Sequence, residues 1–260
     1  MNERRQRLYR VEAIVLRRTD VGEADRLLTV LTAERGKLHL LAKGVRKTLS
    51  RKAGHVELFT HSTFLVAKGR IWDIVAQADT IESYLPLRQD LLRTTYAHYV
   101  AELVDRLTGE ADESKSLFDL LRVTLSRLSE GDDPYLAVRF FELHLLSWAG
   151  YQPQLFFCAR CQTSLEPVIN NYFSFEDGGA LCPRCGEGVA QVEPLPLNTL
   201  KVLRFLQTHE YDMARRLRLS PGLRAEMERL LYRYIVYVLE RNLKSVDFLW
   251  TLRRQMGWVA

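Results

Sequence analysis

The stretch VEAIVLRRTDVGEADRLLTVLTAERGKLHLLAK, residues 11–43, decides the fold of the amino-terminal part of this chain. It contains runs rich in Val, Leu, Ile and Thr that are broken by Gly22 and Gly36, a pattern typical of strands joined by tight turns. Five such short strands before residue 80 predict a small β-barrel of the OB type, and strand number alone leaves an SH3-like barrel open. The expected strands are Val11–Arg18, Arg26–Thr32, Lys37–Lys43, Thr60–Ala67 and Arg70–Ala76.

After Pro86 the apolar residues recur at the helical period of 3.6 residues. The clearest helix signal is Asp133-Pro134, a capping residue followed by proline at the first helical position, with Gly150 after the last turn. The sequence therefore predicts an α+β multidomain protein, with an OB-fold domain at residues 1–81 and a helical domain at 82–260. The expected helices are Gln89–Leu107, Ser116–Leu128, the segment from Asp133 to Gly150, Thr199–Thr208 and the segment that begins at Ser220.

All four cysteines lie in an insert, about residues 153–196, where the helical period disappears. Cys158 and Cys161 form one C-x2-C pair, and Cys182 and Cys185 form a second pair after 20 intervening residues. Two thiolates on a tight turn hold one side of a tetrahedral ion, and a second turn completes its coordination. The spacing predicts one structural Zn(2+), although a rubredoxin-like iron site has the same pattern. Two disulfides or a redox dithiol would also use four cysteines in this arrangement.

The net charge is +5, and the excess lies entirely in the first third of the chain. Residues 1–80 contain 16 Lys and Arg against 9 Asp and Glu, whereas the remainder contains 21 against 23. Between Arg35 and Lys52 there are seven cations and no acid, and the stretch from residue 43 to residue 52 falls between two expected strands. Such a loop predicts contacts with the phosphates of a nucleic acid, and a solvated basic face is the alternative. The candidate nucleic-acid-binding residues, which the resemblance given below makes DNA-binding, are Arg17, Arg18, Arg35, Lys37, Lys43, Arg46, Lys47, Arg51 and Lys52.

Barrels that bind single strands also use aromatic side chains on which bases stack. The aromatic residues of the barrel segment are expected to fill its core instead, because a small barrel needs large side chains inside. No P-loop, dinucleotide-binding, nucleophile-elbow or HExxH motif occurs, and we expect no enzyme activity. The aromatic residues in question are Tyr9, Phe59, Phe64 and Trp72.

The composition, 47% hydrophobic and 27% charged, is that of an ordinary globular chain and not of a disordered one. The longest apolar run, Tyr234–Leu239, is far shorter than the roughly 20 residues that a membrane-spanning helix needs. The amino-terminal segment shows no apolar stretch of signal-peptide length. We therefore expect a cytoplasmic protein.

The order of these features resembles the bacterial RecO family of recombination mediators. The resemblance rests on residues 13–18 followed by 22–26, on the loop 43–47, on Gly150-Tyr151-x-Pro153 before Cys158, and on the late stretch 242–245. It covers essentially the whole chain. Some members of that family lack the cysteines.

The resemblance implies a protein that binds single- and double-stranded DNA and anneals complementary strands. It also implies work with RecR in the RecF pathway, and help in loading RecA onto strands covered by single-stranded DNA-binding protein, whose acidic C-terminal tail the family contacts. The location would be the bacterial cytosol, at the nucleoid. An RNA-binding or transcription-associated module is the alternative, since barrels and zinc ribbons occur there too. A metal-dependent nuclease is disfavoured, because no carboxylates stand at a usable spacing.

Overall fold

The computed structural model describes residues 7–110, 112–166, 171–240, 242–243, 245–246 and 249 of the 260-residue chain. Its contacts group into two compact units, Met1–Gly131 and Asp132–Ala260, and each is described by itself. Within the described residues no helix is long and apolar enough to cross a membrane.

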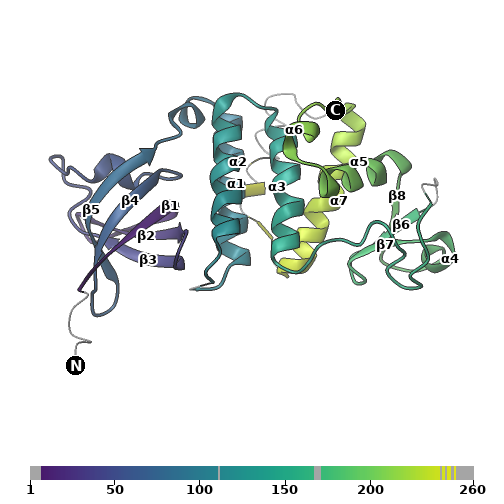
Figure 1. Cartoon of the computed structure of the whole chain (residues 1–260), viewed down its shortest axis with the longest axis horizontal. Coiled ribbons are helices and arrows are strands. Elements are labelled where there is room, and N and C mark those ends of the chain that lie inside the picture. The colour runs from purple at the N-terminus through teal and green to yellow at the C-terminus, as the bar shows by residue number, and fades with distance from the viewer. Residues whose placement is uncertain are drawn as a thin grey trace. The chain divides into compact units, whose positions relative to one another are not determined.

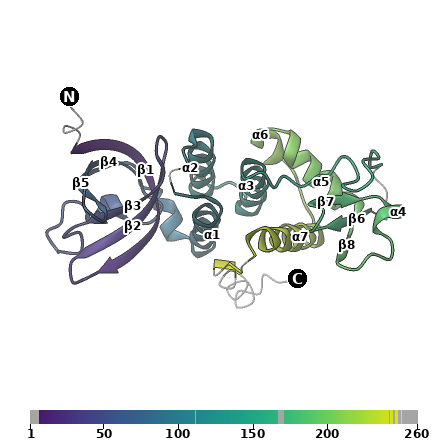
Figure 2. The ribbon, with the colours of Figure 1, turned by 90° about the horizontal axis from the view of Figure 1, so that it is seen from below.

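The first unit begins with a closed five-stranded barrel, whose strands follow one another around the ring in the order β1-β2-β3-β5-β4 (Figures 1 and 2). The long strand β1 pairs antiparallel with β4 through its first half and with β2 through its second half. The ring is closed by the single parallel pair, β3 with β5. The strands are β1 (Leu8–Val21), β2 (Asp25–Thr32), β3 (Gly36–Ala42), β4 (His61–Ala67) and β5 (Asp73–Glu82).

Strand β1 is buried on both of its faces. Val11, Ala13 and Val15 point into the barrel core, whereas Ile14 and Leu16 are buried although they lie outside that core cluster. Two helices cover this outer side, with α1 (Leu91–Leu107) against β1 and α2 (Lys115–Glu130) against β2. The apolar–polar alternation of a strand that is exposed on one face is therefore incomplete.

The last expected strand starts three residues later than predicted. Arg70, Ile71 and Trp72 lie in the turn between β4 and β5, and the expectation of a strand from Arg70 was wrong at that end. The reason is local, since the Asp73 carboxylate accepts a hydrogen bond from the Gly69 N–H at 3.0 Å and holds the turn.

The second unit packs three long helices against one another: α3 (Pro134–Trp148), α5 (Leu197–Thr208) and α7 (Pro221–Leu239), with the short α6 (Tyr211–Ala214) beside α3 and α5. Helix α3 begins as expected, with the Asp133 carboxylate accepting from the Tyr135 N–H at 3.0 Å and proline at the first helical position. Ser220 caps α7 in the same way.

The cysteine insert contains a three-stranded sheet in the order β7-β6-β8 and one short helix. Its elements are β6 (Asn171–Ser174), β7 (Gly179–Leu181), α4 (Pro183–Gly186) and β8 (Val192–Leu195). The predicted fold class, an OB-like barrel followed by helices with a four-cysteine insert, is confirmed. The division of function between residues 1–81 and 82–260 stays a prediction, and residues 82–131 pack with the barrel unit.

Asp133 also pairs with Arg224 at 2.5 Å, so it ties the start of α3 to α7. Replacing Asp133 with Ala removes both the cap and this pair, and we expect a loss of about 1–2 kcal/mol in the free energy of unfolding. Asp133→Asn keeps a capping side chain and should lose less than half as much. Urea unfolding followed by circular dichroism measures the difference, and equal losses in the two variants would contradict the capping role.

Candidate nucleic-acid interface and metal centre

The segment Lys43–Lys52, called the basic loop below, leaves the end of β3 as a series of ordered turns. Val45 is buried in the barrel core and anchors the loop. The Gly44 N–H donates to the Asp25 carboxylate at 2.7 Å, and further backbone hydrogen bonds join Lys47 to Gly44 and Ser50 to Lys47. The loop therefore presents its cations from a fixed backbone.

Three cations of the basic loop, Lys43, Lys47 and Arg51, are exposed and have no carboxylate partner among the described residues. Arg46 lies 3.3 Å from an Asp20 carboxylate oxygen. Lys52 donates to the Val75 carbonyl at 2.9 Å, and burial lowers the pKa of its ammonium group. The free positive charge of this loop is thus concentrated on three side chains.

Two predicted contacts lie beside the end of α1, Lys37 nearly buried there and Arg17 still largely exposed. Lys37 Nζ donates to the carbonyl oxygens of Asp105 and Thr108, each at 2.7 Å, and its side chain is only 10% exposed. Arg17 lies 3.6 Å from the Asp105 carboxylate. This placement of Lys37 is at odds with an exposed phosphate contact, and we leave Lys37 out of the proposed interface.

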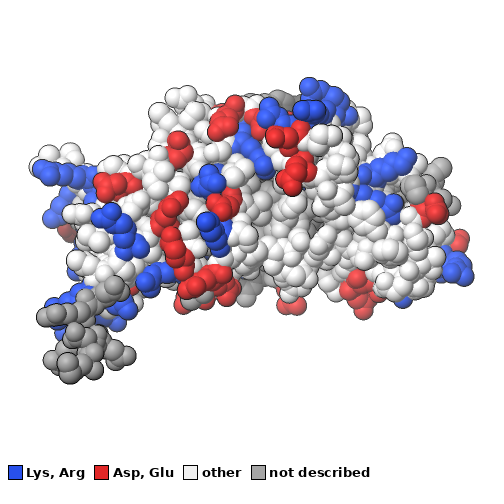
Figure 3. All heavy atoms as spheres, viewed as in Figure 1, with Lys and Arg blue, Asp and Glu red and all other residues white. Residues whose placement is uncertain are grey.

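Arg18 pairs with Glu57, which also holds Arg26 at 3.1 Å. Arg35 lies apart from the basic loop, in the turn between β2 and β3, where its guanidinium carbon is 4.5 Å from the Tyr9 ring centroid. The nine predicted cations therefore do not form one cluster. On the face drawn in Figure 3, blue atoms gather over the barrel, with red atoms in a band beside them.

The sequence did not reveal a second group of exposed cations on the barrel. Arg7, Arg10, Lys68 and Arg70 are exposed, and none has a carboxylate partner among the described residues. The Lys68 N–H donates to the Arg7 carbonyl at 2.9 Å, so the start of β1 and the end of β4 lie together. Because these residues are spread over more than 60 positions, no charge run in the sequence could reveal them.

The aromatic candidates divide into two groups. Phe59 and Phe64 are buried, and Tyr9 packs partly buried against the barrel core, as expected. Trp72 is 38% exposed, against the expectation of a core position. The turn that displaces the start of β5 is the reason.

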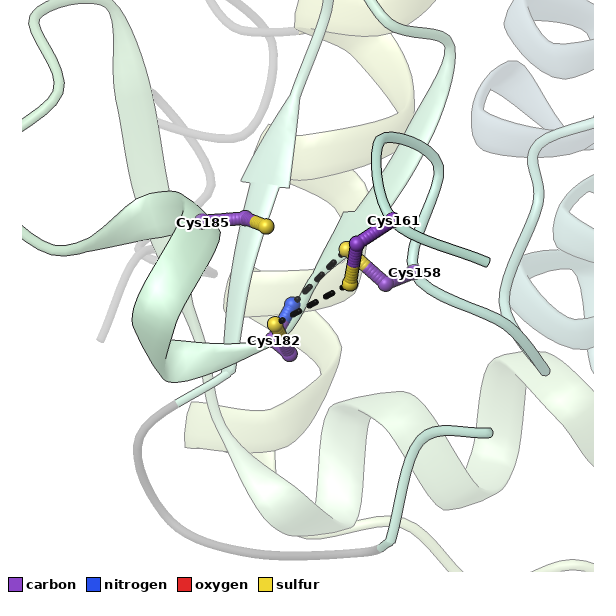
Figure 4. Close-up of side chains that lie close together, drawn as sticks. All are labelled: Cys158, Cys161, Cys182 and Cys185. Carbon is purple, nitrogen blue, oxygen red and sulfur yellow. Dashed lines mark hydrogen bonds between the residues drawn. The ribbon is translucent and has the colours of Figure 1, made fainter. Parts of the chain in front are cut away.

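The metal centre is formed by the four cysteines, whose Sγ atoms all lie within 4.8 Å of one another (Figure 4). Cys161 Sγ and Cys182 Sγ are 3.7 Å apart, close to the edge of about 3.8 Å of a tetrahedron with ligands 2.3 Å from its centre. The Cys182 N–H points at Cys158 Sγ, 3.4 Å away. These four side chains could hold one metal ion.

The two turns that carry the cysteines are tightly built. In the first, the Cys158 N–H donates to the Thr163 carbonyl at 2.8 Å, and in the second the Cys185 N–H donates to the Cys182 carbonyl at 3.0 Å. Gly186 lies against the Tyr172 ring, where an added Cβ would come within 2.4 Å. Glycine is therefore required at that position for the second turn to pack on β6.

The thiols differ in how readily they ionise. A hydrogen bond from the Thr163 hydroxyl helps to lower the pKa of Cys161 to about 6. Hydrogen bonds with Cys161 and Cys182 raise the pKa of Cys185 to about 12. A divalent ion bound by the four sulfurs would stabilise them as thiolates.

The insert is held by the helices of its own unit. Arg204 of α5 donates to the carbonyl oxygens of Leu155 and Leu165 at 2.8 and 2.9 Å, on either side of the first cysteine turn. Phe173 of β6 packs edge-on against Tyr234 of α7, with ring centroids 5.4 Å apart. Arg160, which lies inside the first turn, is paired with Asp177 at 2.9 Å. Loss of order at the cysteines would therefore also destabilise α5 and α7.

The fold and these sites define a class of protein: a barrel with ordered cationic loops, joined in one chain to a helical unit that carries a four-cysteine metal centre. Two family models match the chain, "Recombination protein O N terminal" over residues 6–84 and "Recombination protein O C terminal" over residues 88–247. The chain belongs to the RecO family, and the resemblance seen in the sequence is confirmed.

Full-length relatives agree with the family models. The chain is 45% identical over 252 residues to the DNA repair protein RecO of Roseiflexus sp. (strain RS-1), which covers 97% of this chain and 88% of the relative. It is 41% identical over 243 residues to the DNA repair protein RecO of Pelotomaculum thermopropionicum, covering 94% of each chain. The protein of the same name from Dehalococcoides mccartyi (strain ATCC BAA-2100) is 37% identical over 245 residues, with 94% of this chain and 96% of the relative covered.

The position of Lys37 predicts a structural role. Lys37→Met leaves the carbonyl groups of Asp105 and Thr108 without their donor, and we expect a loss of about 1–3 kcal/mol in the free energy of unfolding. Lys43→Met, a matched change at an exposed lysine, should stay within about 0.5 kcal/mol of the parent. Urea unfolding compares the two, and a Lys37→Met protein as stable as Lys43→Met would refute the assignment.

Proposed function

We propose that this chain is a non-enzymatic DNA-binding protein that anneals strands and mediates recombination in DNA repair. The observation that carries the proposal is the basic loop, where Lys43, Lys47 and Arg51 stand exposed, with no carboxylate partner among the described residues, on a fixed backbone. Side chains of this kind neutralise phosphates and release counterions, which gives binding that is independent of sequence and sensitive to salt. The names of the relatives, which call them DNA repair proteins, support the same conclusion.

Membership of the RecO family supports the finer assignment to the RecF pathway. In that pathway the chain would act with RecR and help load RecA onto DNA covered by single-stranded DNA-binding protein. The acidic tail of the latter requires cations, and Arg216 and Arg218 line a hollow near α6 together with Asp212 and Arg215. Arg215 is paired with Asp132, so Arg216 and Arg218 are the side chains we assign to such a tail.

We further propose that the metal is one Zn(2+) per chain and that it is structural. Four cysteines complete a tetrahedral shell and leave no position for water or substrate. The four cysteines are free of disulfide bonds, which suits the reducing cytosol, and we propose a bacterial cytoplasmic location near DNA.

The basic loop is tested by the triple variant Lys43→Ala, Lys47→Ala, Arg51→Ala. Its affinity for single-stranded DNA should fall by about tenfold at moderate salt, and the slope of log affinity against log salt should flatten by roughly 2, since each phosphate contact contributes about 0.7. Fluorescence anisotropy with a labelled oligonucleotide across a salt series measures both quantities.

The matched control removes the same charge elsewhere, with Lys115→Ala, Lys201→Ala and Arg229→Ala, all exposed helical positions. This control should keep the parent affinity. If the two triple variants weaken binding equally, net charge alone is responsible and the basic loop is not the interface. Annealing of complementary DNA strands coated with single-stranded DNA-binding protein separates the proposed mediator from an RNA-binding module, which would show no such activity.

The metal assignment predicts about one zinc per chain by elemental analysis. Cys158→Ser should lose the ion and the hydrogen-exchange protection of the amides at both cysteine turns, with a smaller loss in α5 and α7. A chelator should have the same effect on the parent protein and none on the Cys158→Ser variant. Bound iron, or a chelator-resistant parent, would overturn the zinc assignment.

A further inference from the structure

The turn Lys68–Trp72 between β4 and β5, called the hairpin tip below, combines exposed apolar and cationic side chains. Ile71 is 84% exposed and Trp72 is 38% exposed, and the exposed cations Lys68 and Arg70 lie just before them in the same turn. Exposed apolar side chains at a loop end reduce solubility, and such side chains often mark a binding site. A ligand that fits this tip would have an apolar face for Ile71 and Trp72 and negative charge for Lys68 and Arg70.

The hairpin tip is held in one conformation. The Asp73 carboxylate accepts from the Gly69 N–H at 3.0 Å and from the Tyr9 hydroxyl at 2.6 Å. Gly69 approaches the Trp72 carbonyl so closely that an added Cβ would stand 1.9 Å from that oxygen. A side chain presented by an ordered turn loses little entropy when it binds.

Further positive charge lies beside the base of the tip. The Arg35 guanidinium stacks on Tyr9, whose hydroxyl is bonded to Asp73. The backbone of Lys68 is bonded to that of Arg7. The Asp73 carboxylate accepts from Gly69 and Tyr9, and it forms no ion pair with a cation among the described residues.

We propose that the hairpin tip is a base-stacking element for single-stranded DNA, with an unpaired base on the face of Trp72 and its phosphates on Lys68 and Arg70. This inference rests on the proposed function and adds a contact that the basic loop does not make. Stacking on an indole is possible for every base, since each base has an apolar face, and the flanking cations match the charge of the strand. The unpaired state of the base is required because a base inside a duplex is already stacked on both faces.

The test compares two oligonucleotides of roughly 16 residues, one of dT and one abasic with the same phosphates. The parent protein should bind the dT strand about five to ten times more tightly than the abasic strand. Trp72→Ala should bring this ratio close to 1 while the affinity for the abasic strand stays the same, and Trp72→Phe should keep part of the preference. Phe157→Ala, which removes a comparably exposed aromatic residue from the second unit, should leave the ratio unchanged.

The basic-loop triple variant should weaken both oligonucleotides in parallel and keep the ratio, so it reports on the proposed function and not on stacking. If the proposed function fails, neither strand binds in a salt-dependent way. If only the inference fails, both strands bind and the preference for dT survives Trp72→Ala. The same result is expected if the hairpin tip contacts a protein instead of DNA. Quenching of tryptophan fluorescence by dT gives a second measurement, and it should be reduced in the folded Trp72→Phe variant.

Discussion

Burial of β1 on both faces is the constraint on which the rest of the first unit depends. Val11, Ala13 and Val15 fill the barrel, and Ile14 and Leu16 are covered on the outside, where α1 packs. The helices that cover this side also bring acids to it, which is why Asp105 takes up Lys37 and Arg17. The exposed cations Lys43, Lys47 and Arg51 of the basic loop, by contrast, have no carboxylate partner among the described residues.

The presence of the five barrel strands and of the main helices was predictable, although the ends of the last strand were not, because each depends on residues close together in the sequence. The cysteine pairs were predictable for the same reason. Asp133 caps α3 and the four cysteines converge, as the spacing indicates. Which cations pair with acids and which stay exposed was not predictable. Lys37 and Asp105 are 68 positions apart, and nothing in either segment shows that one ends beside the other. The hairpin tip had a local signal, Gly69 followed by Asp73, which is the pair that closes the turn.

In the second unit, the stability of the cysteine insert depends on contacts outside its own small sheet. Its insert has three short strands, too little apolar surface to be stable alone, and it gains order from the cysteine turns and from Arg204, which donates to the backbone on both sides of the first turn. The Arg204 guanidinium is partly buried where it reaches those carbonyls, and this burial lowers its pKa. Within the insert Arg160 is paired with Asp177, whereas Arg184 is exposed, and the contacts of Arg204 and Phe173 join the insert to α5 and α7.

The basic loop and the hairpin tip would make different contacts with a DNA strand. Phosphate contacts of the basic loop would act on both single and double strands, because both present a charged backbone. A stacking contact at Trp72 acts only where a base is unpaired, and it does not read which base is present. Together they would favour single strands of any sequence over duplex. That selectivity suits annealing, because the protein would hold each strand before pairing and lose its stacking contact once the bases pair.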